Sequence, residues 1–266
     1  MAINKFNVTM LMFPEFERYK IYNKPISIPD NSGETGIRGQ SKDPEKSIRQ
    51  SISRAKEKIF GYVMSNDWDY WATQTFNQEV IDRFNLDEIV RRYGQKLRNL
   101  KRRNYNNLRW LIVPEMHENG AWHLHLFISG IPKEKIIYSG FNYYNKEKRF
   151  FRKVYNWIDT INFGFNDYIY IGDIDKVEQY KIAIYITKYI TKELGAIRFN
   201  KKMYWVSKGL LKPTKINVYT ENENYDKKIK SKAPVLKESS YFLKDSLTGE
   251  VFNHVTDITI FKPIPF

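Results

Sequence analysis

Hydrophobic and polar positions along this chain predict a mixed succession of strands and helices. Segments rich in aromatic and β-branched residues predict strands at 69–76, 108–113, 122–128 and 168–171. Segments with apolar residues three or four positions apart predict helices over about 44–63, 86–103, 146–158 and 176–194. After the first helix, the order is therefore β-α-β-β-α-β, followed by a further helix.

This order predicts an α+β fold with the split β-α-β arrangement of ferredoxin-like and RRM-like domains. In that arrangement, the first and third strands lie side by side at the centre of an antiparallel sheet. One face of the sheet is left free of the crossover helices. The helix predicted over 176–194 is available to cover that open face.

The same pattern divides the chain into three parts. Residues 1–43 are expected to form an N-terminal extension, and residues 44–214 the main domain. Residues 215–266 form a C-terminal extension that we expect to pack on the domain. Strand-like pieces occur at 203–206 and 257–261, but their path through the fold does not follow from the sequence.

The charge of the chain favours a polyanionic partner. Its 266 residues include 44 Lys and Arg against 30 Asp and Glu, which gives a formal charge of +14. The 19 Tyr and 6 Trp add rings on which bases can stack. A Lys-, Asn-, Ile- and Tyr-rich composition is also what an AT-rich genome produces, so charge alone does not establish nucleic-acid binding.

Several classes of site and segment are excluded. The chain has no cysteine, so disulfides, thiolate zinc sites and cysteine nucleophiles are ruled out. It has no Gly-Lys dipeptide, which rules out a Walker A phosphate loop. No apolar run approaches about 18 residues, and the first residues lack the core of a signal peptide. We therefore expect a soluble, intracellular protein.

The segment Trp122-His-Leu-His-Leu126 turns two imidazoles to one face of a strand and apolar side chains to the other. Neutral imidazole is a common ligand of divalent metal ions, so His123 and His125 are candidate metal ligands. Two histidines at this spacing also arise by chance, and structural roles are the alternative interpretation.

Glu115 is the best candidate for a third ligand, because it ends the neighbouring strand. A two-residue Asn119-Gly120 turn would place Glu115 opposite Leu124, on the wrong face. A bulge or an odd-length loop shifts the register by one residue and brings Glu115 level with a histidine. His117 and Glu118 are the alternative ligands, and a solvated carboxylate is the alternative interpretation of Glu115.

The helix predicted over 176–194 carries a polar stripe beside a stripe of isoleucines. The polar stripe consists of Tyr185, Lys188, Tyr189 and Lys192. A phenol with a pKa of about 10 is a poor nucleophile at neutral pH, but a nearby lysine and a metal-bound phosphate both favour the phenolate. Ordinary packing explains a tyrosine pair taken alone. The repeated Tyr-x-x-Lys downstream of the histidines favours chemistry on a phosphodiester.

Together, these residues resemble the HUH endonucleases, named for a His–hydrophobic–His motif, and specifically the rolling-circle replication initiators (Rep proteins) of phages and plasmids. Three motifs occur in the family's order: Ala72-Thr73-Gln74-Thr75-Phe76, then Glu115 with His123-Leu124-His125, then Tyr185-x-x-Lys188-Tyr189-x-x-Lys192. The resemblance covers about 44–212 and extends to Ser207-Lys-Gly-Leu-Leu-Lys-Pro213, which is similar to a segment that follows the nucleophile helix in phage-type members.

The resemblance implies a metal-dependent DNA endonuclease and strand transferase. Mg²⁺ or Mn²⁺, held by the glutamate and the two histidines, would activate the scissile phosphate of single-stranded origin DNA. Tyr185 or Tyr189 would attack it and leave a 5′-phosphotyrosine and a 3′-OH primer, and the second tyrosine would allow closure of the displaced circle. Lys188 and Lys192 lie beside these nucleophiles. No helicase is visible, so the expected partners include a host helicase and polymerase in the cytoplasm of a bacterial cell.

Two basic segments without any carboxylate, 91–109 and 198–215, flank the proposed site. Their candidate DNA-binding residues are Arg91, Arg92, Arg98, Lys101, Arg102, Arg103, Lys201, Lys202 and Lys208. Aromatic residues among them are candidate stacking platforms, namely Tyr105, Trp110, Tyr204 and Trp205. Solvated helix faces are the alternative interpretation of these cations.

Other functions stay open on the same residues. An HUH-type transposase shares the chemistry, but such enzymes generally use one tyrosine. A mobilisation relaxase usually has its tyrosine before the histidine cluster, which is the reverse of the order here. A non-catalytic module that binds single-stranded nucleic acid would use the same scaffold, with sheet aromatics that stack bases and with structural His and Tyr residues.

Overall fold

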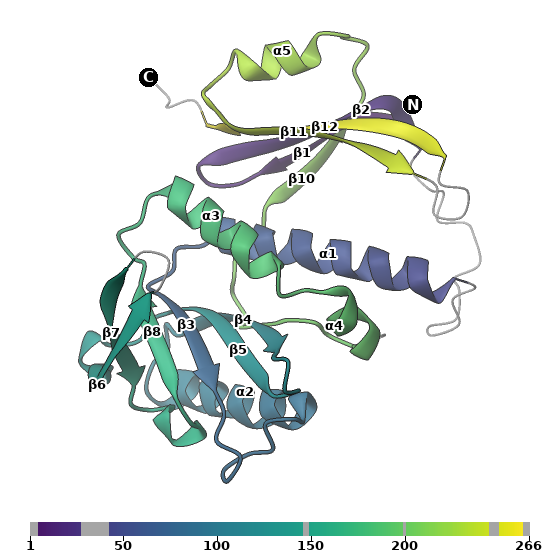
Figure 1. Cartoon of the computed structure of the whole chain (residues 1–266). Helices are drawn as coiled ribbons and strands as arrows, with labels where there is room; N and C mark the ends of the chain where they lie inside the picture. Colours follow the sequence, from purple (N-terminus) through teal and green to yellow (C-terminus); the bar gives the residue numbers. More distant parts are fainter. Residues whose placement is uncertain (1–4, 28–42, 146–148, 199–200, 245–249, 263–266) are drawn as a thin grey trace. The chain divides into compact units, whose positions relative to one another are not determined.

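The computed structural model describes residues 5–27, 43–145, 149–198, 201–244 and 250–262, without the side chains of Asn145, Lys192 and Ala196. The chain divides into two compact units (Figure 1). The first unit is Ser47–Leu211, and the second combines Met1–Lys46 with Lys212–Phe266. Each unit is built around its own five-stranded sheet.

The sheet of the first unit is antiparallel, with the strand order β8-β3-β5-β4-β9. Its strands are β3 (Tyr70–Thr75), β4 (Arg109–Met116), β5 (Trp122–Ser129), β8 (Asn166–Tyr170) and β9 (Trp205–Val206). The predicted first and third strands correspond to β3 and β5. They lie side by side in the middle of the sheet, as expected.

The helices expected over 44–63 and 86–103 are confirmed as α1 (Pro44–Met64) and α2 (Leu86–Arg103). Asn85 caps α2, because its side chain accepts a hydrogen bond of 3.1 Å from the backbone N–H of Glu88. Figure 1 shows α2 on one side of the sheet and α3 (Lys176–Thr187) on the other.

Both sides of the sheet are therefore covered by apolar helix faces. Tyr93 of α2 is fully buried and packs edge-on against Phe76, with 5.8 Å between ring centroids. On the opposite side, Tyr180 of α3 packs edge-on against Phe60 of α1 at 5.4 Å. These contacts hold the sheet between two helical layers and fix the face on which the histidines lie.

The helix predicted over 146–158 is wrong. This region forms a β-hairpin of β6 (Ile136–Asn145) and β7 (Phe150–Trp157), with residues 146–148 outside the described structure. The aromatic and β-branched side chains of the segment favour a pleated surface over a helix. A hairpin therefore replaces the second crossover helix, and the complete ferredoxin-like order is not confirmed.

The single helix predicted over 176–194 is also wrong, because α3 ends at Thr187 and a short α4 (Lys192–Ile197) follows. The amides of residues 188–190 bond three residues back instead of four, which forms a tighter turn. Thr191 then caps α4 by accepting a hydrogen bond of 3.1 Å from the Leu194 N–H. Tyr185 therefore lies in α3, whereas Tyr189 lies in the turn.

The second unit joins both ends of the chain in one sheet, with the order β10-β1-β2-β12-β11. Its elements are β1 (Lys5–Met12), β2 (Phe16–Ser27), β10 (Thr214–Val218), α5 (Tyr225–Lys230), β11 (Val235–Lys244) and β12 (Val251–Phe261). Ile229 of α5 is buried against Val8, Tyr19 and Ile258. The strand-like pieces at 203–206 and 257–261 contribute to different sheets, as β9 and β12.

Candidate active site

The hairpin between β4 and β5 sets the register of the candidate metal ligands. Its loop contains three residues, 118–120, closed by a hydrogen bond of 2.9 Å from the His117 N–H to the Ala121 carbonyl. Gly120 has a φ of +82°, which a residue without a Cβ adopts most easily. Glu115 consequently lies opposite His123, so the odd-length loop considered in the sequence is confirmed.

Glu115 and His125 are in direct contact. Glu115 Oε2 lies 2.7 Å from His125 Nε2 and 3.8 Å from His117 Nε2. The hydrogen bond from His125 holds the pKa of the Glu115 carboxyl below its usual value, although partial burial acts in the opposite direction. The carboxylate is therefore ionised at neutral pH and directed at the imidazoles.

Two threonines of β3 hold the other nitrogen of each candidate imidazole. Thr75 Oγ1 lies 2.9 Å from His123 Nδ1, and Thr73 Oγ1 lies 3.3 Å from His125 Nδ1. Both contacts join directly opposed residues of β3 and β5. A partner at Nδ1 fixes the ring and leaves Nε2 to face the site, as is usual for metal-binding histidines. These threonine roles were missed in the sequence, where the strand was only expected to support the site.

His123 also contacts a third imidazole. Its ring stacks on His117, with 3.7 Å between centroids and 11° between planes. Burial lowers the pKa of His123 to about 4, and the nearby His117 and His125 contribute in the same direction. His123 is therefore neutral at physiological pH, which is the state in which imidazole binds a metal ion.

The donor chemistry fits a divalent cation, but the side chains do not surround one. In the described part of the chain, no group of three or more His, Asp or Glu residues stands in a metal-holding arrangement. Glu115 bonds directly to His125, and His123 is stacked on His117. A carboxylate with two or three imidazoles is nevertheless a donor set that suits Mn²⁺ and similar ions.

Tyr189 lies directly on the candidate metal ligands. Its ring stacks on that of His125, with 4.0 Å between centroids and 6° between planes. The indole of Trp71 is also nearly parallel to His125, at 5.5 Å. Beside them is a hollow of about 360 Å³ whose lining includes Glu115, Lys188 and Tyr189. A ligand that enters this hollow can reach both the carboxylate and the phenol.

Tyr185 lies at the margin of the same cluster. Its ring is edge-on to Tyr189 at 5.4 Å and to Trp71 at 6.4 Å, and 48% of the residue is exposed. Burial raises the pKa of Tyr189, and its hydrogen bond to Tyr185 acts in the same direction. Tyr189 is therefore the more protected phenol and Tyr185 the more accessible one.

The two predicted lysines stand differently. Lys188 Nζ lies over the face of the Tyr185 ring, 5.5 Å from its centroid. In that position, the ammonium group contributes a positive potential next to the phenols. The side chain of Lys192 lies outside the described residues, although its backbone begins α4.

Arg83 is a cation at this site that was missed in the sequence. It belongs to the loop between β3 and α2, and its charge contributes to lowering the pKa of His123. Its Nε is buried and has no hydrogen-bond partner among the described residues. A guanidinium with an unused donor beside a candidate metal site is suited to bind a phosphate oxygen.

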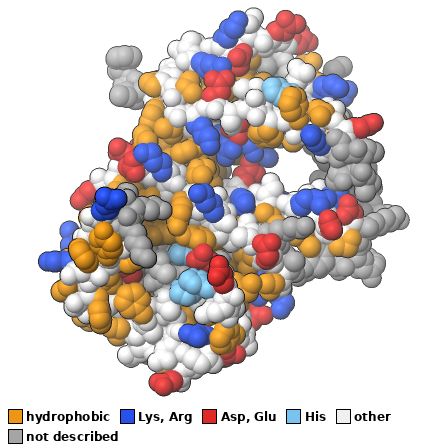
Figure 2. Space-filling model, in the orientation of Figure 1, with side chains coloured by type: hydrophobic (Ala, Val, Ile, Leu, Met, Phe, Trp, Pro, Cys, Tyr) orange, Lys and Arg blue, Asp and Glu red, His pale blue; other side chains and the backbone are white. Residues whose placement is uncertain are grey.

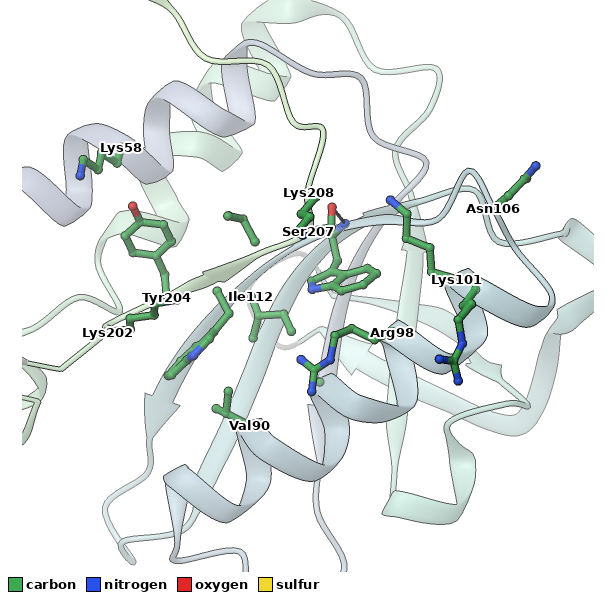
Figure 3. Close-up of a pocket in the computed structure, with 15 residues that line it drawn as sticks. Lys58, Val90, Arg98, Lys101, Asn106, Ile112, Lys202, Tyr204, Ser207 and Lys208 are labelled. Carbon is green, nitrogen blue, oxygen red and sulfur yellow. Dashed lines mark hydrogen bonds between the residues drawn. The ribbon is translucent and has the colours of Figure 1, made fainter.

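Five of the nine predicted DNA-binding cations line one cavity of about 1070 Å³ (Figure 3). They are Arg98, Lys101, Arg102, Lys202 and Lys208. Trp110, Tyr204 and Trp205 line the same cavity, so aromatic rings and cations alternate around it. Figure 3 shows Arg98 and Lys101 on α2, across the cavity from Tyr204.

The other four predicted cations do not line this cavity. Arg91 and Arg103 are exposed on α2. Arg92 donates to the Val80 carbonyl at 2.7 Å and to Glu88 at 3.1 Å. Lys201 forms an ion pair of 3.0 Å with Asp87. Arg92 and Lys201 are therefore already paired within the protein.

Figure 2 shows histidine side chains beside acidic ones on the visible face of the first unit. Among the described residues, no helix is long and apolar enough to cross a membrane. No curated protein and no solved structure matches the chain.

A family model does match the segment that holds the candidate site. Residues 69–194 match the model of a replication-associated protein family of the ORF2 type. The matched segment includes β3 with its two threonines, the Glu115 and histidine hairpin, and both tyrosines. Over this segment, the chain is similar to replication-associated proteins, which fits a Rep-type initiator and suggests a role in replication initiation.

Proposed function

We propose that this protein is a rolling-circle replication initiator that nicks and rejoins single-stranded origin DNA through a 5′-phosphotyrosine. The observation that carries the proposal is the stacking of Tyr189 on His125, whose Nε2 contacts Glu115. A candidate nucleophile and a candidate set of metal ligands thus meet at one point, within the segment that is similar to replication-associated proteins.

Glu115, His123 and His125 would hold Mg²⁺ or Mn²⁺, with His117 close enough to serve as a further ligand. When bound, such a cation supplies Lewis-acid activation of the scissile phosphate. Thr73 and Thr75 hold the imidazoles by Nδ1, so that the Nε2 atoms face the site. The Glu115–His125 hydrogen bond must open, which requires rotation of side chains and no change in the sheet.

In the proposed reaction, the phenol oxygen of Tyr185 or Tyr189 attacks phosphorus and forms a tyrosine–phosphate bond. The bond from phosphorus to the 3′-oxygen breaks, the phenolic proton passes to water, and the 3′-oxygen gains a proton to become the primer hydroxyl. Lys188 and Arg83 place positive charge where negative charge develops on the phosphate. The second phenol would take part in the strand transfer that closes the displaced circle.

The cavity lined by Arg98, Lys101 and Trp110 is the proposed path for DNA outside the scissile phosphate. Its cations would bind the backbone and its rings would stack unpaired bases, which gives affinity with little sequence preference. Unwinding and synthesis would be supplied by a host helicase and polymerase in the bacterial cytoplasm.

The test is to incubate the protein with Mn²⁺ and single-stranded DNA from the replicon that encodes it. We expect a covalent protein–DNA adduct that resists denaturation. The double variant Tyr185→Phe with Tyr189→Phe should form none, and each single variant should identify which phenol makes the first cut. An adduct that survives the double substitution would contradict the assigned nucleophiles.

A metal variant provides an independent readout. His123→Ala should lose adduct formation while it still binds single-stranded DNA, and Mn²⁺ binding measured by calorimetry should weaken in Glu115→Gln. Unchanged Mn²⁺ binding in both variants would rule out the proposed ligands.

A non-catalytic module that binds single-stranded nucleic acid is the second candidate. It is favoured by the direct Glu115–His125 contact, which satisfies both groups without a metal ion. Absence of an adduct with every origin fragment, with DNA binding retained, would support it. An HUH-type transposase shares the chemistry and would require its element's transposon ends in place of a replication origin as substrate.

A further inference from the structure

The β6–β7 hairpin exposes an unusual number of aromatic rings. Seven are at least one-third exposed: Tyr138, Phe141, Tyr143, Tyr144, Phe150, Phe151 and Tyr155. Figure 2 shows hydrophobic side chains gathered over the part of the first unit that β6 and β7 occupy. Contiguous exposed apolar surface of this kind marks a binding site more often than a bare surface.

The strand register sorts these rings onto two sides of the hairpin. Residues that pair directly across two antiparallel strands project to the same side. Tyr144 pairs with Phe151, Asn142 with Lys153, and Tyr138 with Tyr155, and these three pairs follow one another along one side. We call Tyr138, Tyr144, Phe151, Lys153 and Tyr155 the aromatic ladder. Phe150 and Tyr143 belong to the opposite side.

The members of the aromatic ladder contact one another. The rings of Tyr144 and Phe151 lie 4.9 Å apart, and those of Tyr138 and Tyr155 lie 6.1 Å apart. Lys153 lies between the two ring pairs, with Nζ 5.5 Å from the centroid of Tyr138. A cation therefore stands between two exposed aromatic platforms, which is the pattern that binds a phosphate between two stacked bases.

The aromatic ladder leads into a hollow of about 430 Å³ beside β8. Its lining includes Lys153 and Tyr155 of the ladder together with Lys133 and Tyr170. Lys133 Nζ lies 5.7 Å from the centroid of the exposed Tyr170 ring, so a second pair of cation and ring continues the first.

The hairpin is fixed to the sheet that holds the candidate active site. Arg152, on the side opposite the ladder, forms a two-pronged ion pair with Asp167 of β8, with one contact of 3.0 Å. Asp167 lies opposite Thr73 of β3. The ladder is thus a preformed surface at a defined place on this sheet, and the one arginine of the opposite side is already neutralised.

Charge decides which kind of partner fits. Residues 133–157 contain seven Lys and Arg and two Glu, so a second copy of this surface would be repelled and a polyanion attracted. The exposed rings require unpaired bases, because bases within a duplex are already stacked. We propose that the aromatic ladder binds single-stranded DNA that flanks the cleavage site. The proposal rests on the proposed function for the identity of the nucleic acid.

The experiment compares two neighbouring phenylalanines that project to opposite sides. Binding of a labelled single strand of about 20 nucleotides, longer than a typical single-strand site, is measured by fluorescence anisotropy without added metal. Phe151→Ala should weaken binding about tenfold, as expected for loss of one base-stacking ring. Phe150→Ala removes the same group from the other side and should leave affinity within about twofold.

Lys153→Gln gives a second readout, because removing one phosphate contact reduces the dependence of log affinity on log salt by about 0.7 for a single strand. Equal affinity of Phe151→Ala and Phe150→Ala would overturn the proposal. So would preference for a duplex of the same sequence, or a protein dimer in sedimentation that Phe151→Ala abolishes while DNA binding is unchanged. Melting temperatures of both variants verify folding.

This result is separable from the nicking proposal. If the ladder binds no DNA, a short oligonucleotide with only the scissile site should still form an adduct in Phe151→Ala as in the unsubstituted protein. If the nicking proposal fails, the affinity difference between the two phenylalanine variants still stands.

Discussion

The first unit contains two β-hairpins of opposite character. In the β4–β5 hairpin, side chains on both sides of each strand are covered, and Leu111, Val113, Leu124 and Leu126 are fully buried. In the β6–β7 hairpin, rings on both sides are exposed, and the pairing slips between Tyr138 and Asn142. Burial on both sides leaves only one tolerable register, whereas an exposed ribbon tolerates an irregularity.

This difference explains where each kind of chemistry is placed. Metal ligands need positions fixed to a fraction of an ångström, and the buried hairpin supplies them through Glu115 opposite His123. Stacking on unpaired bases tolerates looser geometry, and the exposed hairpin supplies rings at the surface. The comparison can be tested with matched substitutions.

The largest expected difference is between two isoleucines. Ile128 of β5 is fully buried, whereas Ile137 of β6 is 43% exposed. Ile128→Ala should lower the free energy of unfolding by about 3–4 kcal/mol, because it leaves a cavity in a packed core. Ile137→Ala should cost about 1 kcal/mol or less. Urea unfolding measures both, and equal losses would show that the β6–β7 hairpin is packed as tightly as β4–β5.

A smaller difference is expected for two glycines with nearly the same backbone. Gly130, after β5, has a φ of +84°, and Gly140 in β6 has a φ of +85°. A Cβ at Gly130 would lie 2.6 Å from the Asn107 carbonyl oxygen, whereas one at Gly140 would have no neighbour within 4 Å. Gly140→Ala should cost about 1 kcal/mol from backbone strain alone.

Gly130→Ala should cost about 3 kcal/mol, since overlap with the backbone adds to the same strain. Thermal unfolding of the two variants separates the terms. A loss for Gly140→Ala as large as that for Gly130→Ala would mean that the β6 irregularity is as constrained as the end of β5.

The next prediction concerns how the buried hairpin is oriented by β3. Thr75→Val keeps the shape of the side chain and removes the hydroxyl that holds His123 Nδ1 at 2.9 Å. Loss of such a support typically weakens metal binding by about 10–100-fold. Thr73→Val should have a smaller effect, because its contact with His125 is 3.3 Å. Mn²⁺ titration calorimetry measures both, with Thr75→Ser as the variant that retains the hydroxyl.

The smallest predicted effect is a dependence of stability on pH. The pKa of His123 falls from 6.5 to about 4 on folding, so the unfolded chain binds the additional proton between these values. The stabilisation from neutral His123 is complete above pH 6.5 and is lost as the pH falls towards 4. His123→Gln should flatten the decline of the urea midpoint over this range. An unchanged slope would mean that His123 is not buried as described.

Local pattern was sufficient for much of the first unit. Helix α2 starts after Asn85 and ends at Arg103, as its apolar spacing predicted, because its buried stripe is regular. The register of Glu115 could be narrowed to two choices because strand geometry permits only even or odd loops. The choice between them depends on Gly120, whose positive φ closes a three-residue loop.

Other features could not be derived because they depend on distant partners. The second unit pairs β1 with β10, so that Thr9 contacts Asn217 across 208 positions of sequence. The end of α3 depends on Thr187, which bonds back to the Ile184 carbonyl at 2.7 Å, and on Thr191 as the cap of α4. A cap signal inside a continuous apolar stripe is readable in principle, but the stripe was given more weight.

The turn between α3 and α4 gives the two phenols different freedom of motion. Tyr185 is held by the regular bonds of a helix, while Tyr189 is held by a few three-residue bonds between two helices. Such turns open at lower free energy and on shorter timescales than helix interiors. In the proposed reaction, exchange between the phenols therefore needs displacement of only residues 188–191. The strands that carry the metal ligands stay still, so a second cut needs no second metal site.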